Sequence, residues 1–443
     1  MTTKEEWLAQ AKKPAADAMQ AHPFYRGKIQ IAPKVPVRSV QDFSIWYTPG
    51  VAAPCRDIEA HPEKVWEHTN RGNTIAVVSD GTRVLGLGDI GPEAGMPVME
   101  GKALIFKYLG GVDAVPICLD TKDPDLFIQT VKLLQPSFGG INLEDIAKPK
   151  CFRILDTLRA EMSIPVWHDD QQGTAAVTLA GLVNALKVVG KDLGNVSIAM
   201  IGAGAANVAI LRLVLAAGAD PARVMMVDTK GILHAERSDF APDDPRAEFA
   251  LHTNGENRRG GIPEALQGTD VSIALSCPGP NTLQAEWLKA MAQDAILFAC
   301  ANPIPEIWPW EAQEAGVRVV ATGRSDFPNQ VNNSLGFPGI FRGVLDVRAR
   351  TISDEMAIAA AYEIALCAEE KGLREDYIMP TMDEWDVFPR EAVATALKAQ
   401  EQGLARLSKS RETLYAEAKA QIQAARTMLE TMIEGEMIAP MPV

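Results

Sequence analysis

Four acidic residues stand in the chain as two adjacent pairs, and this arrangement indicates metal chemistry. Glu144-Asp145 follows the apolar segment "INL", and Asp169-Asp170 follows "IPVWH". Adjacent carboxylates repel each other, and burying one of them without a partner is costly. A divalent cation removes this conflict, because oxygen ligands in this number suit Mg²⁺ or Mn²⁺. The four carboxylates therefore predict a Mg²⁺ or Mn²⁺ site.

Two other interpretations of these acids remain open. Asp145 and Asp170 each precede a predicted helix, so both could be helix caps. Capping needs one carboxylate per helix, whereas the chain offers two at each place. Structural zinc is disfavoured because Glu144-Asp145 has no His or Cys beside it. His168 is expected to be a packed histidine rather than a ligand.

The elements that must position these acids alternate between strand and helix. Helices are expected at 98–111, 123–136 and 150–162, and strands at 112–120, 138–145 and 164–170, after a strand pair at 73–91. Such β-α-β-α-β alternation is typical of a parallel sheet, whose ligands lie beyond the carboxyl ends of the strands. Both acidic pairs fall at such ends, so we expect them to be neighbours in space.

A second unit begins near residue 193 with a strand, a glycine turn, a helix and another strand. Its turn, 202–207, is an incomplete G-x-G-x-x-G match, because Asn207 replaces the last glycine. Gly202 can make the tight turn, and Gly204 lets backbone N–H groups approach a pyrophosphate. Asp228 closes the next strand and could accept a hydrogen bond from a ribose hydroxyl, which favours NAD. Lys230 and Arg237 lie close behind it and leave NADP open.

The segment 86–91 is a full match to the same pattern, but we do not expect it to bind a cofactor. Pro92, Gly95 and Pro97 follow it, so no helix is expected to start there and offer its N-terminus to a phosphate. After residue 345 the pattern becomes mostly helical and ends in a long helix predicted at 390–432. The fold class expected is therefore α/β, with an N-terminal parallel sheet, a Rossmann-like domain and a helical C-terminal segment.

The bulk composition narrows the class of protein. A chain of 443 residues has room for two or three domains, and a net charge of −14 without a Lys/Arg cluster disfavours nucleic-acid binding. No run of 18 apolar residues occurs, and the polar N-terminus resembles no signal peptide. The six scattered cysteines indicate reduced thiols. We therefore expect a cytoplasmic protein with no membrane partner.

A nicotinamide site beside a carboxylate-held cation predicts oxidation of a hydroxy acid. The cation would chelate the hydroxyl and a carboxylate of the substrate and stabilise the charge that develops on that oxygen. If the product is a β-keto acid, the same cation would serve as the electron sink for decarboxylation.

Several strings together resemble the malic enzyme family in its short bacterial form. They run in the expected order over roughly residues 40 to 400: "YTPGVAAPCRDI", "SDGTRVLGLGDIGPEAGMPVMEGKALIF", "INLEDIAKPKCFRIL", "IPVWHDDQQGTAAVTLAGL", "ANPIPE" and "VNNSLGFPGIFRG". The resemblance implies oxidative decarboxylation of L-malate to pyruvate and CO₂ with NAD or NADP. It implies an N-terminal catalytic domain at 1–165, a Rossmann-like domain at 166–345 and a helical segment at 346–443.

The resemblance also assigns roles to individual residues. The general acid would be Tyr47 and the general base Lys102, whose pKa burial and the cation would lower, with Asp169 assisting the lysine. The metal ligands would be Glu144, Asp145 and Asp170. Arg83, Asn302 and Asn332 would contact substrate, and Asn302 the nicotinamide as well. The remaining cofactor contacts would be Thr174, which begins a helix under the nicotinamide, and Gly202, Ala203, Gly204, Ala205, Asn207 and Asp228.

Three further expectations follow. The first is a homodimer or higher homo-oligomer, in which the N-terminal segment and the C-terminal helices form an interface that completes the active site. The second is an alternative net reaction, that of an oxaloacetate decarboxylase or a malolactic-type lyase on the same scaffold. The third is a catalytically inactive dinucleotide-binding regulator, against which Tyr47, Lys102 and the four carboxylates argue.

Overall fold

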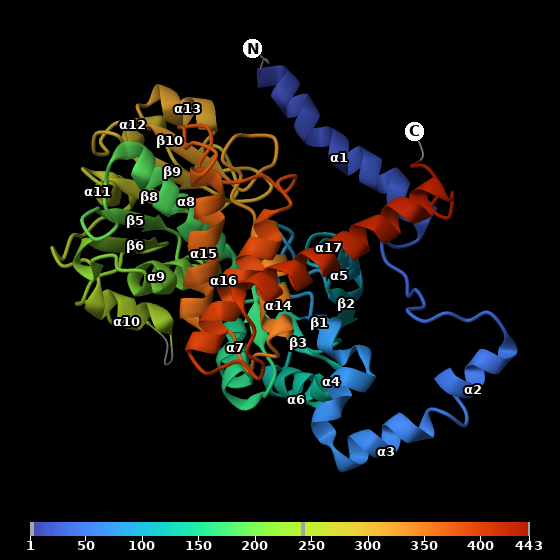
Figure 1. Ribbon diagram of the computed structural model, residues 1–443. Helices are drawn as coiled ribbons and strands as arrows, with labels where there is room; N and C mark the ends of the chain where they lie inside the picture. Colours follow the sequence, from blue (N-terminus) through green and yellow to red (C-terminus); the bar gives the residue numbers. More distant parts are fainter. Residues whose placement is uncertain (1–3, 241–243, 442–443) are drawn as a thin grey trace.

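The computed structural model describes residues 4–240 and 244–441, and it contains two separate sheets surrounded by helices (Figure 1). The first sheet has the strand order β2-β1-β3-β4 and is entirely parallel. Its strands are β1 (Thr74–Ser79), β2 (Asp113–Cys118), β3 (Gly140–Leu143) and β4 (Val166–His168). The predicted parallel sheet is confirmed, and its central strands β1 and β3 are almost wholly buried.

The helices that connect these strands are α5 (Pro92–Gly110), α6 (Pro124–Leu134) and α7 (Lys150–Glu161). Asp123 caps α6 by accepting a hydrogen bond from the Asp125 N–H, with Pro124 at the first helical position, as the sequence predicts. Because β3 and β4 are neighbours, the acids that follow them lie at one edge of the sheet.

Two expectations for residues 73–100 were wrong. The predicted strand pair is one strand, β1, followed by a loop that holds only the isolated bridge Val84–Gly88. The loop turns toward β3 instead of pairing, since the Arg83 N–H donates to the Asp145 carbonyl. Helix α5 does begin at Pro92, directly after Gly91. Proline is well suited to the first helical position, so Pro92 starts the helix rather than preventing it.

The second sheet has the order β10-β9-β8-β5-β6-β7, and only β7 is antiparallel. Its strands are β5 (Ile198–Ile201), β6 (Val224–Asp228), β7 (Gly231–Ile232), β8 (Val271–Ala274), β9 (Ile296–Ala299) and β10 (Val319–Thr322). Its helices are α8 (Thr174–Val189), α9 (Ala205–Ala216), α10 (Pro245–His252), α11 (Ile262–Leu266), α12 (Ala285–Leu288) and α13 (Pro309–Glu314). The predicted Rossmann-like unit is confirmed.

The C-terminal part is helical and packs against both sheets' helices. It comprises α14 (Phe337–Asp346), α15 (Asp354–Glu369), α16 (Val387–Glu401) and α17 (Arg411–Glu434). The single helix predicted at 390–432 is wrong, because the chain breaks between α16 and α17, where Gly403 has a φ of +68°. One continuous apolar core links α5, α8 and α14 to α16, so the two sheets share packing through the C-terminal helices.

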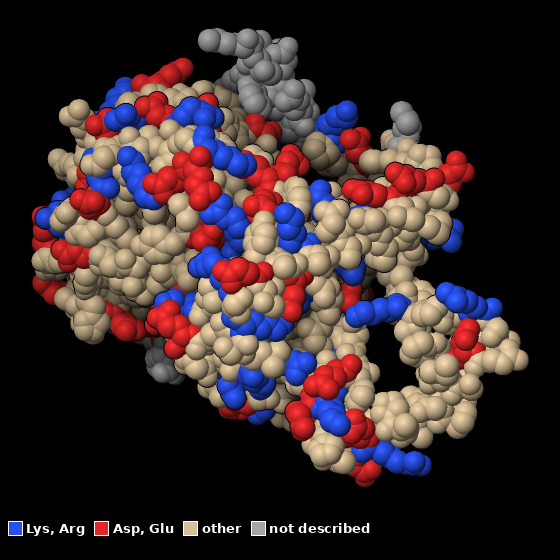
Figure 2. Space-filling model, viewed as in Figure 1, with Lys and Arg blue, Asp and Glu red and all other residues tan. Residues whose placement is uncertain are grey.

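The N-terminal part extends away from this body. It contains α1 (Lys4–Tyr25), α2 (Phe43–Trp46) and α3 (Ala52–Ala60), and it rejoins the body at α4 (Val65–His68). We call residues 32–60 the arm. No residue of the arm is buried, although it carries large apolar side chains. Figure 2 shows it standing apart from the body, whose visible face mixes positive and negative charges.

One helical stretch in the described part of the chain, Asp169–Val189, is long and apolar enough to cross a membrane. Its most apolar window is 78% buried inside the protein. It contains α8, which packs between α9 and α15, as expected of a core helix.

Candidate active site

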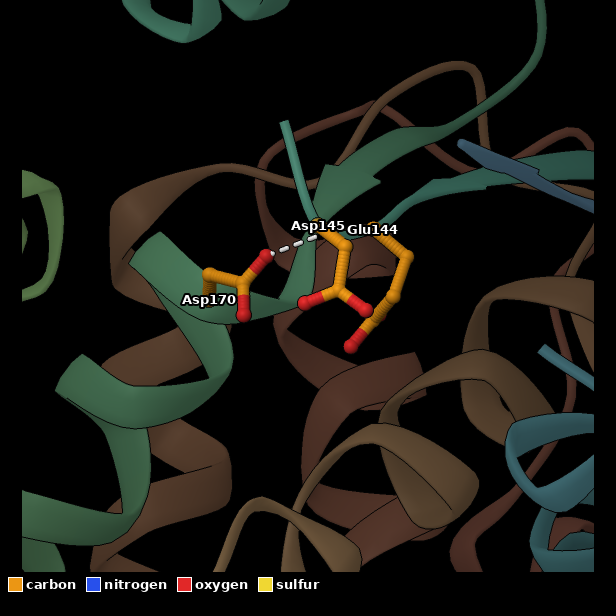
Figure 3. A group of neighbouring side chains, drawn as sticks. All are labelled: Glu144, Asp145 and Asp170. Atoms are coloured by element: carbon orange, nitrogen blue, oxygen red, sulfur yellow. Dashed lines mark hydrogen bonds between the residues drawn. The ribbon is translucent and has the colours of Figure 1, made fainter. Parts of the chain in front are cut away.

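Three of the four acids converge beyond the carboxyl ends of β3 and β4 (Figure 3). Glu144 and Asp145 follow β3, and Asp170 lies in the turn η5 (Asp169–Gly173) after β4. One carboxylate oxygen from each lies within 4.8 Å of the others. Oδ2 of Asp170 accepts the Asp145 N–H at 2.8 Å, which aligns the two strand ends. The sequence-predicted trio is therefore brought together.

The electrostatics of this trio fit a cation. Oδ2 of Asp145 is buried without a hydrogen-bond partner. Burial and the neighbouring charge of Asp170 raise the pKa of Asp145 to about 7. Burial also raises the pKa of Glu144, and the attraction of Lys102 does not offset it. A divalent ion would stabilise the ionised form of such carboxylates, so the residues present fit Mg²⁺ or Mn²⁺.

The capping interpretation does not hold for Asp145. Helix α7 begins at Lys150, five residues later, and no side chain caps it. Asp145 instead has a φ of +55° and receives the Leu85 N–H on its side chain. His168 is fully buried, and both of its ring nitrogens lack a hydrogen-bond partner. It is a packed histidine, as expected, and its Nδ1 lies 3.6 Å from Oδ2 of Asp170.

Lys102 projects from α5 into the same place. Its Nζ lies 2.5 Å from Oδ2 of Asp169 and 2.9 Å from Oε1 of Glu144, and its side chain is 10% exposed. The ring of Phe337, at the start of α14, lies 4.3 Å from the ammonium. Burial acts to lower the pKa of Lys102, but the charges of Asp169 and Glu144 outweigh it and raise that pKa. The lowered pKa expected of Lys102 depends on burial together with a bound cation, so it stays a prediction.

Asp169 does not join the trio but is held beside Lys102. Its carboxylate accepts from Trp167 Nε1 at 3.3 Å and from Asn333 Nδ2 at 3.0 Å. Gly173 packs directly against this carboxylate, which occupies the space that a Cβ would need. Asn333 was missed in the sequence, although the "VNNS" string offers two asparagines. Its neighbour Asn332 turns its side chain to the N–H and hydroxyl of Ser334 instead.

The glycine turn between β5 and α9 depends on its two glycines. Gly202 has a φ of +100°, and a Cβ there would lie 2.6 Å from the Leu275 carbonyl, so only glycine fits. A Cβ on Gly204 would meet nothing within 4 Å, which leaves open space at the start of α9. Asn207 donates to the carbonyls of Ile201 and Gly202 at 2.9 and 2.8 Å. Asn207 stands where the pattern has its third glycine, and its side chain stabilises the turn through these two hydrogen bonds.

The other residues predicted to contact cofactor or substrate lie on several elements. Ala203 is part of the turn, and Ala205 is the first residue of α9. The hydroxyl of Thr174 donates to Asn333 at 3.2 Å. Asn302 lies between the two domains, because a Cβ on Gly86 would meet its carbonyl at 2.9 Å and one on Gly323 would meet its side chain. Arg83 is exposed, and its guanidinium donates to the Leu85 carbonyl.

Two predicted residues differ from their expected surroundings. Tyr47 is the first residue after α2, in the arm, and is 70% exposed. It is therefore the one proposed catalytic residue that the body of a single chain does not enclose. Asp228 ends β6 as expected, but its carboxylate is bound by Arg237 and Arg246 rather than left open.

A Rossmann-like sheet with a glycine turn, together with a buried lysine beside an acidic trio that could hold a cation, is typical of one class, the two-domain α/β oxidoreductases. Known proteins refine this class. The family model described as "Malic enzyme, N-terminal domain" matches residues 26–159, and "Malic enzyme, NAD binding domain" matches residues 171–400. The chain belongs to the malic enzyme family.

Individual relatives agree with this assignment. The chain is 50% identical over 392 residues to the "Bifunctional malic/malolactic enzyme" of Bacillus subtilis, covering 88% of this chain and 94% of that protein. It is 42% identical to the "NADP-dependent malic enzyme" of Halomonas elongata, covering 90% and 96%. The crystal structure of Entamoeba histolytica malic enzyme superposes with a TM-score of 0.96 at 48% identity, covering 100% of this chain and 93% of that one.

Proposed function

We propose that this chain oxidises L-malate and releases pyruvate and CO₂ while it reduces NAD or NADP. The cation, Mg²⁺ or Mn²⁺, would be held by Glu144, Asp145 and Asp170. The observation that carries the proposal is the placement of the Lys102 ammonium, buried between Asp169 and Glu144 at the edge of the acidic trio. A base and a cation site within one pocket are what oxidation of a hydroxyl needs.

The residues of the chain have distinct tasks in this reaction. A bound cation would stabilise negative charge on substrate oxygens, and a bound nicotinamide would accept a hydride. Lys102, once neutral, takes the proton of the C2 hydroxyl while the hydride leaves C2. Asp169 holds Nζ in position. The C3–C4 bond then breaks, CO₂ leaves, and the electron pair remains on the enolate of pyruvate. Tyr47 donates its phenolic proton to C3, and the Lys102 ammonium then returns a proton to the Tyr47 phenolate, which restores the neutral amine.

Tyr47 can protonate C3 only if the arm that carries it reaches a Lys102 and its acidic trio. The arm exposes Val40, Phe43, Ile45 and Trp46, and a segment without buried residues cannot offset the conformational entropy of ordering it. We propose that the arm packs on a second copy of the chain in a homodimer and brings Tyr47 to the Lys102 of that copy. A monomeric mass in light scattering would contradict this assembly.

The Bacillus subtilis relative, named as bifunctional, favours one second candidate. In a malolactic reaction the reduced dinucleotide stays bound and the product is lactate. The same pocket would serve, since both reactions begin by taking the C2 hydroxyl proton. Lactate formation without net reduction of the dinucleotide would identify this route.

Two further features complete the proposal, the domain boundaries and the location in the cell. The domains are taken as 1–165, 166–345 and 346–443, and the first boundary falls between the two ranges that the family models match. Sheet pairing extends to β4 at 166–168, just beyond that boundary. We also propose a cytoplasmic location, which is supported by six cysteines without disulfides, three of them buried.

The test is an initial-rate assay with L-malate and Mn²⁺, with NAD and NADP in parallel. Absorbance at 340 nm, pyruvate and lactate are followed together. Equal amounts of reduced dinucleotide and pyruvate, abolished by a chelator and restored by Mn²⁺, are the expected result. Lactate alone would shift the assignment to the malolactic route. Absence of every product from a folded preparation that binds dinucleotide would reduce the chain to a binding protein.

A further inference from the structure

A fully buried carboxylate joins the segments that follow β8 and β9. Glu306 lies in the loop between β9 and α13, and none of its surface is exposed. Its Oε1 accepts from the Ser276 N–H at 2.8 Å and from the Ser276 hydroxyl at 3.3 Å. Its Oε2 accepts from the Ala301 N–H at 3.1 Å. We call Glu306 with these contacts the clamp.

The two peptide N–H groups of the clamp occupy equivalent places in the second sheet. Ala274 and Ala299 end β8 and β9 and lie opposite each other. Ser276 and Ala301 each stand two positions further along the chain. In a parallel sheet, ligands lie beyond the carboxyl ends of the strands. The clamp therefore fixes the spacing of two strand ends at the edge where a ligand is expected.

The donors of the clamp suit an ionised carboxylate. Two N–H groups and a hydroxyl converge on Glu306, and a carboxylate accepts on both of its oxygens. A glutamine would turn its own amide N–H groups toward one of these donors. Burial raises the pKa of Glu306, and the hydrogen bonds from Ser276 and Ala301 act against that rise. These hydrogen bonds thus favour the charged form.

Both sides of the clamp adjoin residues that are predicted to contact the cofactor. A Cβ on Gly202 would lie 3.2 Å from the Cβ of Ser276, so the glycine turn packs against one side. On the other side, Ala301 is followed directly by Asn302, the predicted nicotinamide contact. Glu306 itself is buried behind them, so it can act on a ligand only through these neighbours.

The two halves of a dinucleotide should depend differently on the clamp. In a sheet of this order the turn after β5 holds the pyrophosphate and the adenosine lies toward β6, which leaves the nicotinamide over β8 and β9. The glycine turn has its own support, because Asn207 donates to two carbonyls at its start. The peptide between Ala301 and Asn302 is held by Glu306. The nicotinamide half should therefore be the sensitive one.

We propose that Glu306 is a positioning residue for the nicotinamide, which it serves by holding Asn302 at the reactive end of the dinucleotide. This inference rests on the proposed function, because it takes the nicotinamide as the hydride acceptor. Loss of the clamp should shift the ring relative to C2 of malate. A misplacement of about 1 Å can lower the rate of such a step by roughly 100-fold.

The test compares binding of the intact dinucleotide with binding of its ADP-ribose part, by titration calorimetry on the full-length protein. NAD is paired with ADP-ribose, or NADP with 2′-phospho-ADP-ribose if the parent binds NADP more tightly. Glu306→Gln leaves one N–H group unpaired and should weaken binding of the dinucleotide by about ten-fold, but that of the ADP-ribose part by less than about two-fold. With L-malate and Mn²⁺, kcat should fall by roughly 10–100-fold.

The matched control is Asp270→Asn, at the opposite edge of the same sheet. Oδ2 of Asp270 accepts from the N–H and the hydroxyl of Ser197 at 2.9 and 2.8 Å, so it joins the amino ends of β5 and β8. Both variants should unfold at lower urea concentration than the parent. Asp270→Asn should keep both affinities within about two-fold of the parent, because no ligand is expected at this edge.

Glu306→Asp covers the case in which Glu306→Gln does not fold. It retains an ionised carboxylate that is one methylene shorter, so the same selective loss of dinucleotide affinity is expected at smaller size. Equal losses for the dinucleotide and its ADP-ribose part, or no loss in either, would overturn the inference. Failure of both variants to fold would also overturn it, because Glu306 would then have a structural role alone.

The proposed function can fail separately from this inference. A folded parent protein that binds the dinucleotide but does not oxidise malate would refute that function, while the two affinities would still test the clamp. A folded parent protein that binds neither NAD nor NADP would refute both.

Discussion

The pocket around Lys102 and the arm differ in how the chain positions them. Lys102, Glu144, Asp145 and Asp169 are buried or nearly so, Asp170 is partly exposed, and all five are held by strand ends, helices and neighbouring hydrogen bonds. The arm has no buried residue, and Tyr47 projects from it at 70% exposure. A single chain thus encloses the proposed base and the residues of the proposed cation site, but it leaves the proposed acid outside. The comparison teaches that a packed core can position one set of candidate residues, whereas an exposed segment needs a partner surface to position its own.

The largest effect is expected from breaking the pocket itself. Lys102→Met should lower kcat by roughly 10²–10⁴-fold, because no other group can take the C2 hydroxyl proton. The matched control is Lys107→Met on the same helix, which removes a lysine paired with Asp113 at the edge of the sheet. Steady-state rates should separate the two variants, while dinucleotide affinity stays the same. Activity within about ten-fold of the parent in Lys102→Met would remove Lys102 as the base.

The second prediction tests whether the arm works across copies. Tyr47→Phe and Lys102→Met should each be inactive alone. When the two are unfolded together and refolded as a mixture, half the dimers are mixed, and one of their two sites has both residues intact. About a quarter of parental activity should therefore return.

The mixing experiment has a clear contrary result. If Tyr47 served the Lys102 of its own chain, no mixed dimer would contain an intact site, and the mixture would stay inactive. The controls are the parent refolded alone, which reports recovery of active sites, and co-purification of tagged Tyr47→Phe with untagged Lys102→Met, which reports exchange.

A smaller effect should follow from loosening the hydrogen bonds of the pocket. Asn333→Ala removes a donor to Asp169 and should lower kcat roughly 10–100-fold with little change in stability. Asn332→Ala removes the cap on its own turn and should cost about 1 kcal/mol of stability, seen in urea unfolding, with a smaller kinetic effect. The opposite order of kinetic losses would restore Asn332 as the substrate contact that the family resemblance implies.

The smallest effect concerns Glu391, which lies fully buried against Gly336 and Gly339 at the start of α14. Burial and the nearby charge of Glu363 raise its pKa well above its ordinary value. The unfolded chain therefore releases this proton at a lower pH than the folded chain. Between the two pKa values stability falls as the pH rises, by at most about 1.4 kcal/mol per pH unit.

Glu391→Gln keeps the shape of the side chain and removes the titration. Its free energy of unfolding relative to the parent should therefore increase from pH 5 toward pH 9 in urea titrations. Glu401→Gln, an exposed position on the same helix, should run parallel to the parent. Parallel curves for both variants would mean that Glu391 does not titrate in this range.

The sequence supported much of the fold because its signals are local. Asp123 caps α6 as predicted, and the strand-helix alternation produces two largely parallel sheets. The acidic trio was predictable for the same reason, since parallel strands place their carboxyl ends at one edge. The errors also have local causes. Proline at the first position of α5 was taken as a helix breaker, and the glycine near residue 403 was not recognised as the end of a helix.

The hydrogen-bond partners of side chains were harder to predict from the sequence than the helices and strands. "VNNS" contains two asparagines, and only the packed structure shows that Asn333 reaches Asp169 while Asn332 caps its own turn. The carboxylate of Asp228 was read as free for a ribose, yet Arg237 and Arg246 occupy it. These choices depend on which rotamers the surrounding residues allow, and hydrophobic periodicity carries no information on that.

By itself, then, the sequence determined the two α/β units, the glycine turn and the pairs of acids at strand ends. Periodicity and turn chemistry act over a few residues, so one chain read in order is sufficient to predict them. The tertiary structure decided how Lys102 meets Asp169, 67 positions away, and how Lys148 meets the glycine turn of the other domain. It also decided that Tyr47 stands on an exposed arm. Contacts between distant segments arise from packing the whole chain, and no local pattern specifies them.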